Sequence, residues 1–448
     1  MRSLSLALVL LLSGCAAKNV NSDYSEILLQ SNVKNELNLK EEWWKDYNQT
    51  YLNELIELGL KNNIDLAKSA VAINKALAQA GVLDANLLPT FSASASAQTS
   101  RNIKRNDSWA RTYGTGISLS YELDLWHKIA DSTDAAMWEA NATKFDLAAM
   151  RLSVINSITD AYFNILYLNE SIKFYEISLK NYNELEAITR YKFELGKEEQ
   201  LSLSQIQSSV LSLKNKIENA EKSLLEAQKT LRILLNVKPD FDLKFSGLSL
   251  SDVKNLGVDL DVPIYVVANR PDLQAAIARI EEGLLNVKAS QKEFYPSITI
   301  GASLKGSADN IGGATSLKFL DGNIAINLPF LNYSKLKSSL KVSEVSFEQA
   351  KLNYMATLNE ALNEIDTYYK AMQKDETLLE NYSKQVQNYE NISEIYKLKY
   401  QYGKSELKDY LEASNNEIDA YVNLLGGKYK LLQDEIQIYK AMAGKFSK

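Results

Sequence analysis

The chain has 448 residues, of which 46% are hydrophobic and 24% charged, a composition typical of folded proteins. Its formal net charge of -6 gives no electrostatic reason to expect a nucleic-acid partner. With one cysteine, Cys15, and one histidine, His127, the sequence has almost nothing from which to build the usual zinc site or a Ser-His-Asp triad. No Walker loop or dinucleotide-binding glycine motif occurs. We therefore predict no metal site, no cofactor and no enzymatic activity.

The first residues have the layout of a secretory signal peptide. Arg2 supplies a positive charge, and the apolar stretch from Leu4 to Leu12 is too short to span a bilayer. The letters LSGC, which end at Cys15, resemble a bacterial lipobox. That resemblance implies a signal peptide over residues 1–14, acyl chains including palmitate on Cys15, a lipidated extension over 15–48, and delivery to the outer membrane. An ordinary signal peptide with a cysteine placed by chance is the alternative.

The rest of the chain repeats itself at a constant offset. Gly196 and Gly403 are 207 residues apart, and the same offset carries Pro89 onto Pro296. A constant offset over this distance indicates an internal duplication, and its period is too long for a solenoid. We predict two repeats, 49–252 and 253–448, each with a helix, a β-hairpin, a long helix and a return helix. The offset also relates Asp65-Leu66 to Asp272-Leu273, Ile117 to Ile324, Lys128 to Lys335, Asn156 to Asn363 and Tyr162 to Tyr369.

Each repeat contains segments with the period of two that is typical of strands. In PTFSASASAQ, apolar residues alternate with serine and glutamine from Phe91 onward, and PSITIGASL alternates in the same way from Ile298. A second alternating segment returns in each repeat, around Ile117 and around Ile324. One apolar face and one face of small polar residues suit lipid on one side and water on the other. A soluble antiparallel sheet is the alternative.

Long helical stretches surround the hairpins. We expect helices over 50–87 and 265–294 before them, long helices over 128–193 and 335–401 after them, and return helices over 201–236 and 406–445. Apolar residues recur at spacings of 3 and 4 from Met355 to Tyr369, with a matching phase from Ile155 onward, which indicates a coiled-coil seam. Gly196 and Gly403 follow the long helices, where glycine favours a left-handed turn. The sequence therefore predicts two helical-hairpin tips.

Four strands are too few to close a membrane barrel, and open sheet edges are not tolerated in lipid. The chain must therefore associate with copies of itself to span a membrane. Two copies would supply eight strands, whereas three would supply twelve and leave a water-filled lumen. The fold class predicted is mainly α with a small β part, in which the strands continue as a tube of coiled coils.

Several motifs resemble the TolC-like outer membrane factors, and within them the lipoprotein channels of drug-efflux systems. The resemblance implies a homotrimer with a twelve-stranded transmembrane β-barrel in the outer membrane and a long α-helical barrel in the periplasm. It implies partners as well: outer membrane lipid, a periplasmic adaptor (membrane fusion) protein and an inner-membrane pump of the resistance-nodulation-division (RND) type. The motifs are the lipobox, WWKDY from Trp43, NNIDLAKSA from Asn62, YELDLW from Tyr121, RPDLQAA from Arg270, FYPSITI from Phe294 and the doubled glycine turn.

The same resemblance places a periplasmic gate at the tips with Gly196 and Gly403. In family members, acidic residues six and nine positions after the second-repeat glycine form constricting rings, which here places Asp409 and Glu412 at those positions. Like charges crowded on a three-fold axis would repel and attract cations. An exposed helical acid without a special role is the alternative.

Other tip positions modify this gate. In the first repeat the two acidic positions are Ser202 and Gln205, so any acidic ring is one-sided. Tyr400 matches an aromatic residue that bridges tip helices in the family. Ser405 stands where a basic partner is expected, which puts a salt-bridge lock in doubt.

Two other functions remain open from the sequence. An exit duct of a type I protein-secretion system would keep the fold and change the cargo. A periplasmic coiled-coil adaptor or scaffold lipoprotein would share the helical hairpin and the lipid anchor. Such adaptors have one helical hairpin, however, and the sequence of this chain predicts two. Outside these functions, we expect His127 to cap or pack at the strand-to-helix junction, and Trp43 and Trp44 to pack the N-terminal extension against the helices.

Overall fold

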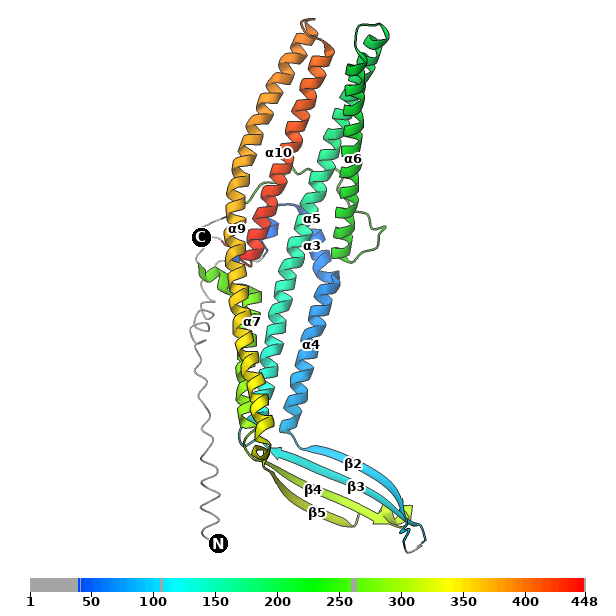
Figure 1. Ribbon diagram of the computed structural model, residues 1–448, viewed down its shortest axis with the longest axis vertical. Coiled ribbons are helices and arrows are strands. Elements are labelled where there is room, and N and C mark those ends of the chain that lie inside the picture. The colour runs from blue at the N-terminus through cyan, green and yellow to red at the C-terminus, as the bar shows by residue number, and fades with distance from the viewer. Residues whose placement is uncertain (1–38, 41, 105–107, 259–263, 447–448) are drawn as a thin grey trace. The chain divides into compact units, whose positions relative to one another are not determined.

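The computed structural model describes residues 39–40, 42–104, 108–258 and 264–446, so Cys15 and the predicted signal peptide lie outside the described residues (Figure 1). The chain divides into two compact units. Unit 1 contains 70–146 and 272–357, and unit 2 contains 147–271, 358–446 and the described residues up to 69. Each unit draws on both halves of the sequence, so this division differs in kind from the predicted repeat boundaries, which stay a prediction. No helix in the described ranges carries an apolar stretch long enough to cross a membrane.

Unit 1 contains a four-stranded antiparallel sheet in the order β2-β3-β4-β5. The strands are β2 (Thr90–Ser100), β3 (Ala110–Leu123), β4 (Ser297–Ala308) and β5 (Phe319–Asn327), as Figure 1 shows. Both predicted hairpins are therefore confirmed, and they join each other through β3 and β4. Strands β2 and β5 form the two edges of the sheet, and each is exposed along its whole length.

A short helix, α8 (Ile311–Ala314), follows β4 in the chain and packs against β4 and β3. The Thr115 hydroxyl on β3 donates a hydrogen bond of 2.5 Å to the Ala314 carbonyl. Gly306 permits this close approach, because a Cβ atom there would lie 2.2 Å from the same carbonyl oxygen. The loop is thereby fixed to the sheet.

The junction between β3 and α5 (Lys128–Glu194) is closed by side-chain hydrogen bonds. The Asp124 carboxylate accepts hydrogen bonds from the backbone N–H groups of Ile129 (3.0 Å) and Ala130 (2.9 Å), which caps the helix. His127 has a φ of 58°, a left-handed conformation that L residues rarely adopt. Its carbonyl accepts from the Lys292 ammonium (3.3 Å), whereas its side chain is exposed and the side-chain cap comes from Asp124, so His127 lies at the junction but the capping or packing role predicted for it stays a prediction.

Unit 2 contains two helical hairpins and the larger core. The hairpins join the distal part of α5 to α6 (Gln200–Leu235), and the distal part of α9 (Tyr333–Gln401) to α10 (Leu407–Ala441). The core gathers the short helix η1 (Trp43–Tyr47) and α3 (Thr50–Asn62) against α5 and α10. Trp43 is 1% exposed and its ring centroid lies 5.1 Å from that of Tyr439 on α10. The prediction that the two tryptophans pack against the helices is confirmed.

A buried carboxylate connects three segments of unit 2. Glu435 on α10 is fully buried and accepts hydrogen bonds from the Tyr47 hydroxyl (2.7 Å) and the Gly257 N–H (2.5 Å). Earlier in the linker, Glu170 on α5 accepts from Leu250 N–H (2.9 Å) and from the Ser251 hydroxyl (2.7 Å). These acceptors hold the linker after α6, which has no helix of its own over 237–258, against α5 and α10.

Most predicted helix bounds agree with the structure to within a few residues, and two do not. The expected helix over 50–87 is wrong at Asn63, which has an extended ψ of 128° and separates α3 from α4 (Ile64–Asp84). The Asn63 side chain accepts hydrogen bonds from the N–H groups of Asp65 and Leu66, so it caps the second helix. The expected helix over 265–294 is also wrong at its start. Residues Ile264–Asn269 form a 3-10 turn, and α7 (Pro271–Lys292) begins at Pro271, since proline suits the first helical position.

The coiled-coil seam differs between the repeats. In the first repeat, Ile155, Ile158 and Tyr162 are fully buried. In the second repeat Met355 is 52% exposed, and the seam residues after it are only half-buried. The sequence period is the same in both, so the difference lies in what one chain has available to cover each helix.

Candidate functional site

The two hairpin tips have the same backbone hydrogen bonds. At the first tip, the N–H of Gly196 bonds the carbonyl of Phe193 (2.9 Å), and the N–H of Lys197 bonds that of Lys192 (2.8 Å). At the second tip, Gly403 bonds Tyr400 (2.9 Å), and Lys404 bonds Lys399 (2.7 Å). Both pairs are the Schellman motif, which satisfies the last carbonyls of a helix.

Glycine is required at both tips by its backbone conformation. Gly196 and Gly403 each have a φ of 68°, and a Cβ added at either would meet no atom within 4 Å. The requirement is therefore not lack of space but the left-handed region, which costs an L residue about 1–2 kcal/mol. The predicted left-handed turns are confirmed. The role of these turns in a gate stays a prediction.

Asp409 caps the helix that follows the second tip. Glu406 is the N-cap of α10, and its backbone N–H donates a hydrogen bond of 3.1 Å to the Asp409 carboxylate, which completes a capping box. Glu412, one turn later, is exposed, and its carboxylate lies 3.9 Å from the Lys408 ammonium. The acidic ring needs several copies around an axis, so for both residues it stays a prediction. The structure adds a local role for Asp409 that the sequence analysis missed, although Glu406 and Asp409 have the spacing of such a box.

The structure gives little support for a special role of the other tip residues named from the sequence. Tyr400 is 42% exposed, and the aromatic bridge predicted for it stays a prediction. Among the described residues, the Ser405 hydroxyl bonds the neighbouring Glu406 carbonyl (3.3 Å) and no acidic side chain, so it does not replace the missing basic residue. In the first repeat Ser202 is half-buried at the start of α6, and Gln205 is exposed.

An ion pair between the two tips was not predicted. The Lys192 ammonium, at the end of α5, forms a short hydrogen-bonded ion pair with the Glu406 carboxylate, at the start of α10. This contact lowers the pKa of Glu406, chiefly through the hydrogen bond. Residues 214 positions apart in sequence meet here, and no local sequence pattern signals such a contact.

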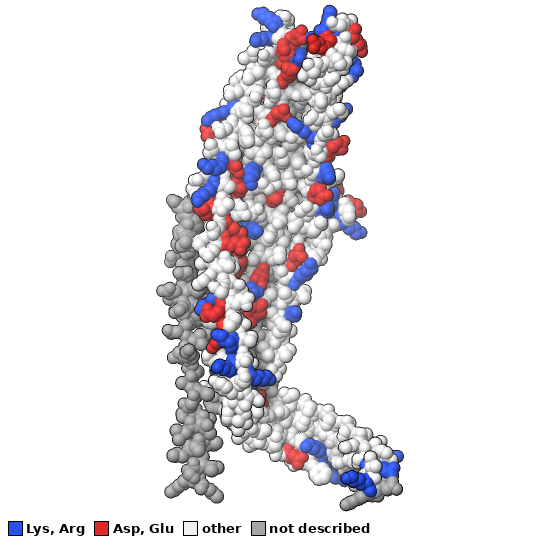
Figure 2. Space-filling model, in the orientation of Figure 1, with Lys and Arg blue, Asp and Glu red and all other residues white. Residues whose placement is uncertain are grey.

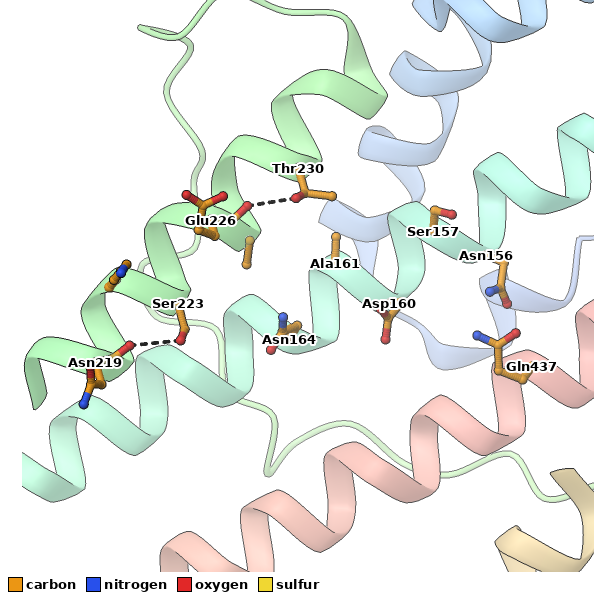
Figure 3. A pocket seen from close by; sticks show the side chains of 12 residues that line it. Asn156, Ser157, Asp160, Ala161, Asn164, Asn219, Ser223, Glu226, Thr230 and Gln437 are labelled. Carbon is orange, nitrogen blue, oxygen red and sulfur yellow. Dashed lines mark hydrogen bonds between the residues drawn. The ribbon is translucent and has the colours of Figure 1, made fainter. Parts of the chain in front are cut away.

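A polar cleft of about 700 Å³ lies between α5 and α6 in unit 2. Figure 3 shows its side chains, which come from both helices, with Gln437 added from α10. The Ser223 and Thr230 hydroxyls donate to helix carbonyls (2.9 Å each), so they present only acceptors to the cleft. Asn156 is 5% exposed, and its Oδ1 has no hydrogen-bond partner within the described structure. The cleft suits water or a small polar solute.

Metal binding has no support from the described residues, among which no three His, Cys, Asp or Glu side chains are grouped to hold an ion. The absence of a cofactor stays a prediction.

Comparison with known proteins gives one consistent result. The family described as outer membrane efflux protein matches residues 55–237 and again residues 265–444. Toxin and drug export protein A from Aggregatibacter actinomycetemcomitans is 36% identical over 449 residues, covering 99% of this chain and 98% of that protein. The probable outer membrane lipoprotein SilC of Salmonella typhimurium is 22% identical over 407 residues, covering 90% of this chain and 87% of SilC.

A solved structure has the same fold. The outer membrane channel CmeC of Campylobacter jejuni gives a TM-score of 0.78 at 27% identity, covering 91% of this chain and 89% of CmeC. The similarity therefore extends over both units and both repeats.

Proposed function

The chain belongs to the outer membrane efflux protein family, and on that premise we propose that it is the outer membrane channel of a tripartite multidrug efflux system. It is a passive exit duct: small molecules enter from the periplasm or from an inner-membrane pump and leave the cell through it. The energy comes from the pump, so the channel itself carries out no catalytic step. The observation that carries this proposal is the family match across both repeats, together with a sheet and paired helical hairpins that give CmeC's fold.

The duct is a homotrimer in this proposal. Three copies supply twelve strands, which suffices for a barrel with an open lumen, whereas the four strands of one chain do not. Within the described residues, β2 and β5 each pair on one side only, so each exposes backbone groups that a neighbouring strand would satisfy. Figure 2 shows that most of the visible face of this sheet is free of charged side chains, which suits contact with lipid.

The partners follow from the same proposal. The tips bind a periplasmic adaptor, which connects the duct to an inner-membrane pump of the RND type. Acyl chains on Cys15 anchor the N-terminal extension in outer membrane lipid. The tips form the gate, with the Asp409 and Glu412 carboxylates of three copies around its axis.

A second candidate is an exit duct for a secreted protein. It is favoured by one observation, the 36% identity to a protein whose name includes toxin export. Protein and drug export need the same open lumen, so the fold does not separate them. The two candidates differ in what accumulates when the gene is deleted.

The test is accumulation of a fluorescent efflux substrate in a deletion strain lacking other outer membrane ducts. We expect higher dye retention than in the parent strain, restored by the intact gene and by a Lys397→Arg variant, which keeps the charge at an exposed position. Unchanged retention with loss of a protein from the culture medium would favour the second candidate. Unchanged retention with an unchanged medium would refute both.

A further inference from the structure

The 207-residue offset preserves contacts as well as sequence. Shifting the observed strand pair Thr90↔Ser120 by 207 gives Ser297↔Asn327, which is also an observed pair. The helix ends obey the same shift: α5 ends at 194 and α9 at 401, and α6 begins at 200 and α10 at 407. The duplication therefore relates the two repeats in three dimensions, residue by residue.

Contacts from repeat 1 to repeat 2 have counterparts that one chain does not complete. Lys192 in repeat 1 pairs with Glu406 in repeat 2. Shifted by the offset, Lys192 becomes Lys399, and Glu406 becomes Glu199. Both charges are retained, although neither Lys399 nor Glu199 forms an ion pair within the described part of the chain.

The surroundings of these two residues agree with an absent partner. Glu199 is the N-cap of α6 but makes no side-chain capping hydrogen bond, so its carboxylate remains available. The Lys399 ammonium lies 5.2 Å from the centre of the Tyr396 ring on its own helix, and Lys399 is exposed. Glu199 on the first tip thus occupies the place of Glu406 on the second, and Lys399 on the second tip occupies the place of Lys192 on the first.

The 207-residue shift also relates the paired strands β3 and β4 to the two edge strands of the sheet. Strands β3 and β4 join the repeats through pairs such as Ile117↔Leu304. Shifting Ile117 forward and Leu304 back by 207 gives Ile324 on β5 and Ala97 on β2, which are the two edges of the sheet. The neighbouring pairs run from Asp321 with Ser100 to Asn327 with Ser94, all inside the observed strands.

We propose that a second copy of this chain docks with its repeat 1 against repeat 2 in the register set by the 207-residue offset, so that Glu199 of one copy pairs with Lys399 of its neighbour and Ala97 lies opposite Ile324. This proposal rests on the assembly of copies proposed above and adds the residues that meet. The strand ladder supplies backbone hydrogen bonds, which hold the copies together. The ion pair is exposed and contributes little to affinity, and its use is to fix which residues face each other.

Zero-length carbodiimide cross-linking tests the tips on the intact, detergent-purified protein. The reagent condenses a lysine ammonium with a carboxylate in contact, forming an amide with loss of water. We expect a Lys192–Glu406 link within each chain as an internal control, and a Lys399–Glu199 link that joins two chains on a denaturing gel. Lys399→Arg keeps the charge but cannot form the amide, so it should abolish only the second link. Lys397→Arg on the same helix should leave both links.

Cysteine pairs test the strand register. Residues directly opposite in an antiparallel pair have Cβ atoms about 4.5–5.5 Å apart, close to the reach of a disulfide. Oxidation should link Ala97→Cys in one copy to Ile324→Cys in the next, and each single variant should give no linked dimer. The pair Ala97→Cys with Ile326→Cys lies two residues out of register on the same face, and it should link at least several-fold less.

The outcomes distinguish failure of the proposed register from failure of the proposed assembly of copies. A single copy by native mass spectrometry would refute the assembly itself. Association of copies, with the Lys192–Glu406 link present but the Lys399–Glu199 link absent, would refute the proposed register. Preferential linking through Ile326→Cys would refute it as well, while leaving the proposed channel intact.

Discussion

Because of Asp434, the hairpin of α9 and α10 should be more stable in mild acid than at neutral pH. Asp434 is 2% exposed, and its Oδ2 has no hydrogen-bond partner among the described residues. Burial raises the pKa of Asp434 from 3.8 to about 6, and the Asp375 carboxyl beside it on α9 adds to the rise. The Lys430 ammonium, 3.5 Å from Oδ1, opposes it. Asp434→Asn removes the charge and keeps the shape.

The sign and size follow from proton linkage. Below about pH 4 Asp434 carries its proton in both the folded and the unfolded chain, so it costs no stability. Between about pH 4 and 6 the folded chain holds a proton that the unfolded chain has already lost, so the free energy of unfolding falls as pH rises across this range and levels off above it. A shift of about two units corresponds to roughly 3 kcal/mol, complete above about pH 7.

The assay is the unfolding temperature of purified protein and of the Asp434→Asn variant between pH 4.5 and 7.5. We expect the variant to be the more stable at pH 7.5, with the difference shrinking toward pH 4.5. Asp366→Asn on α9 is the matched control, because Asp366 is exposed beside Lys370 (2.8 Å) and its loss should change little at any pH. Parallel curves for wild type and Asp434→Asn would refute the reasoning.

Three further predictions follow from the tips and the core. Gly403→Ala should destabilise the second tip by about 1–2 kcal/mol, seen as faster amide hydrogen exchange there, whereas Gly81→Ala in the last turn of α4, where φ is not positive, should stabilise its helix by up to about 0.5–1 kcal/mol. Asp409→Asn retains a side-chain acceptor for the α10 cap but removes the charge, so reconstituted channels should lose block by multivalent cations without faster exchange at α10, and unchanged block would refute the ring. Arg270→Met should lower the free energy of unfolding by about 2 kcal/mol, because Arg270 bonds Glu364 (2.9 Å) with little exposure, and adding Glu364→Gln should recover part of the loss in thermal unfolding.

Sequence periodicity was sufficient for most of the fold. The alternation from Phe91 and from Ile298 placed the strands, because a period of two over so short a segment is typical of a β-strand and does not fit the 3.6-residue period of a helix. The offset between Gly196 and Gly403 then predicted a second copy of each element, and the two glycines share one φ value. Local signals of this kind act within a few residues, so they can be read without knowing the rest of the chain.

Contacts between distant segments could not be predicted in this way. At Asn63 the side chain not only caps α4 locally but also donates a hydrogen bond to the Leu234 carbonyl (2.8 Å), a contact 171 positions away that no local pattern signals. The pair between Lys192 and Glu406 and the burial of Glu435 likewise depend on which helices become neighbours. Asp409 shows the converse, because its spacing from Glu406 fits a capping box and is a local signal that the sequence contains.

Electron microscopy of the purified protein in mild detergent tests the central claim most directly. The account predicts end views with a hollow ring built from three copies, and side views in which a strand-built segment continues as a helical tube. Particles of one copy, or rings without a lumen, would contradict it.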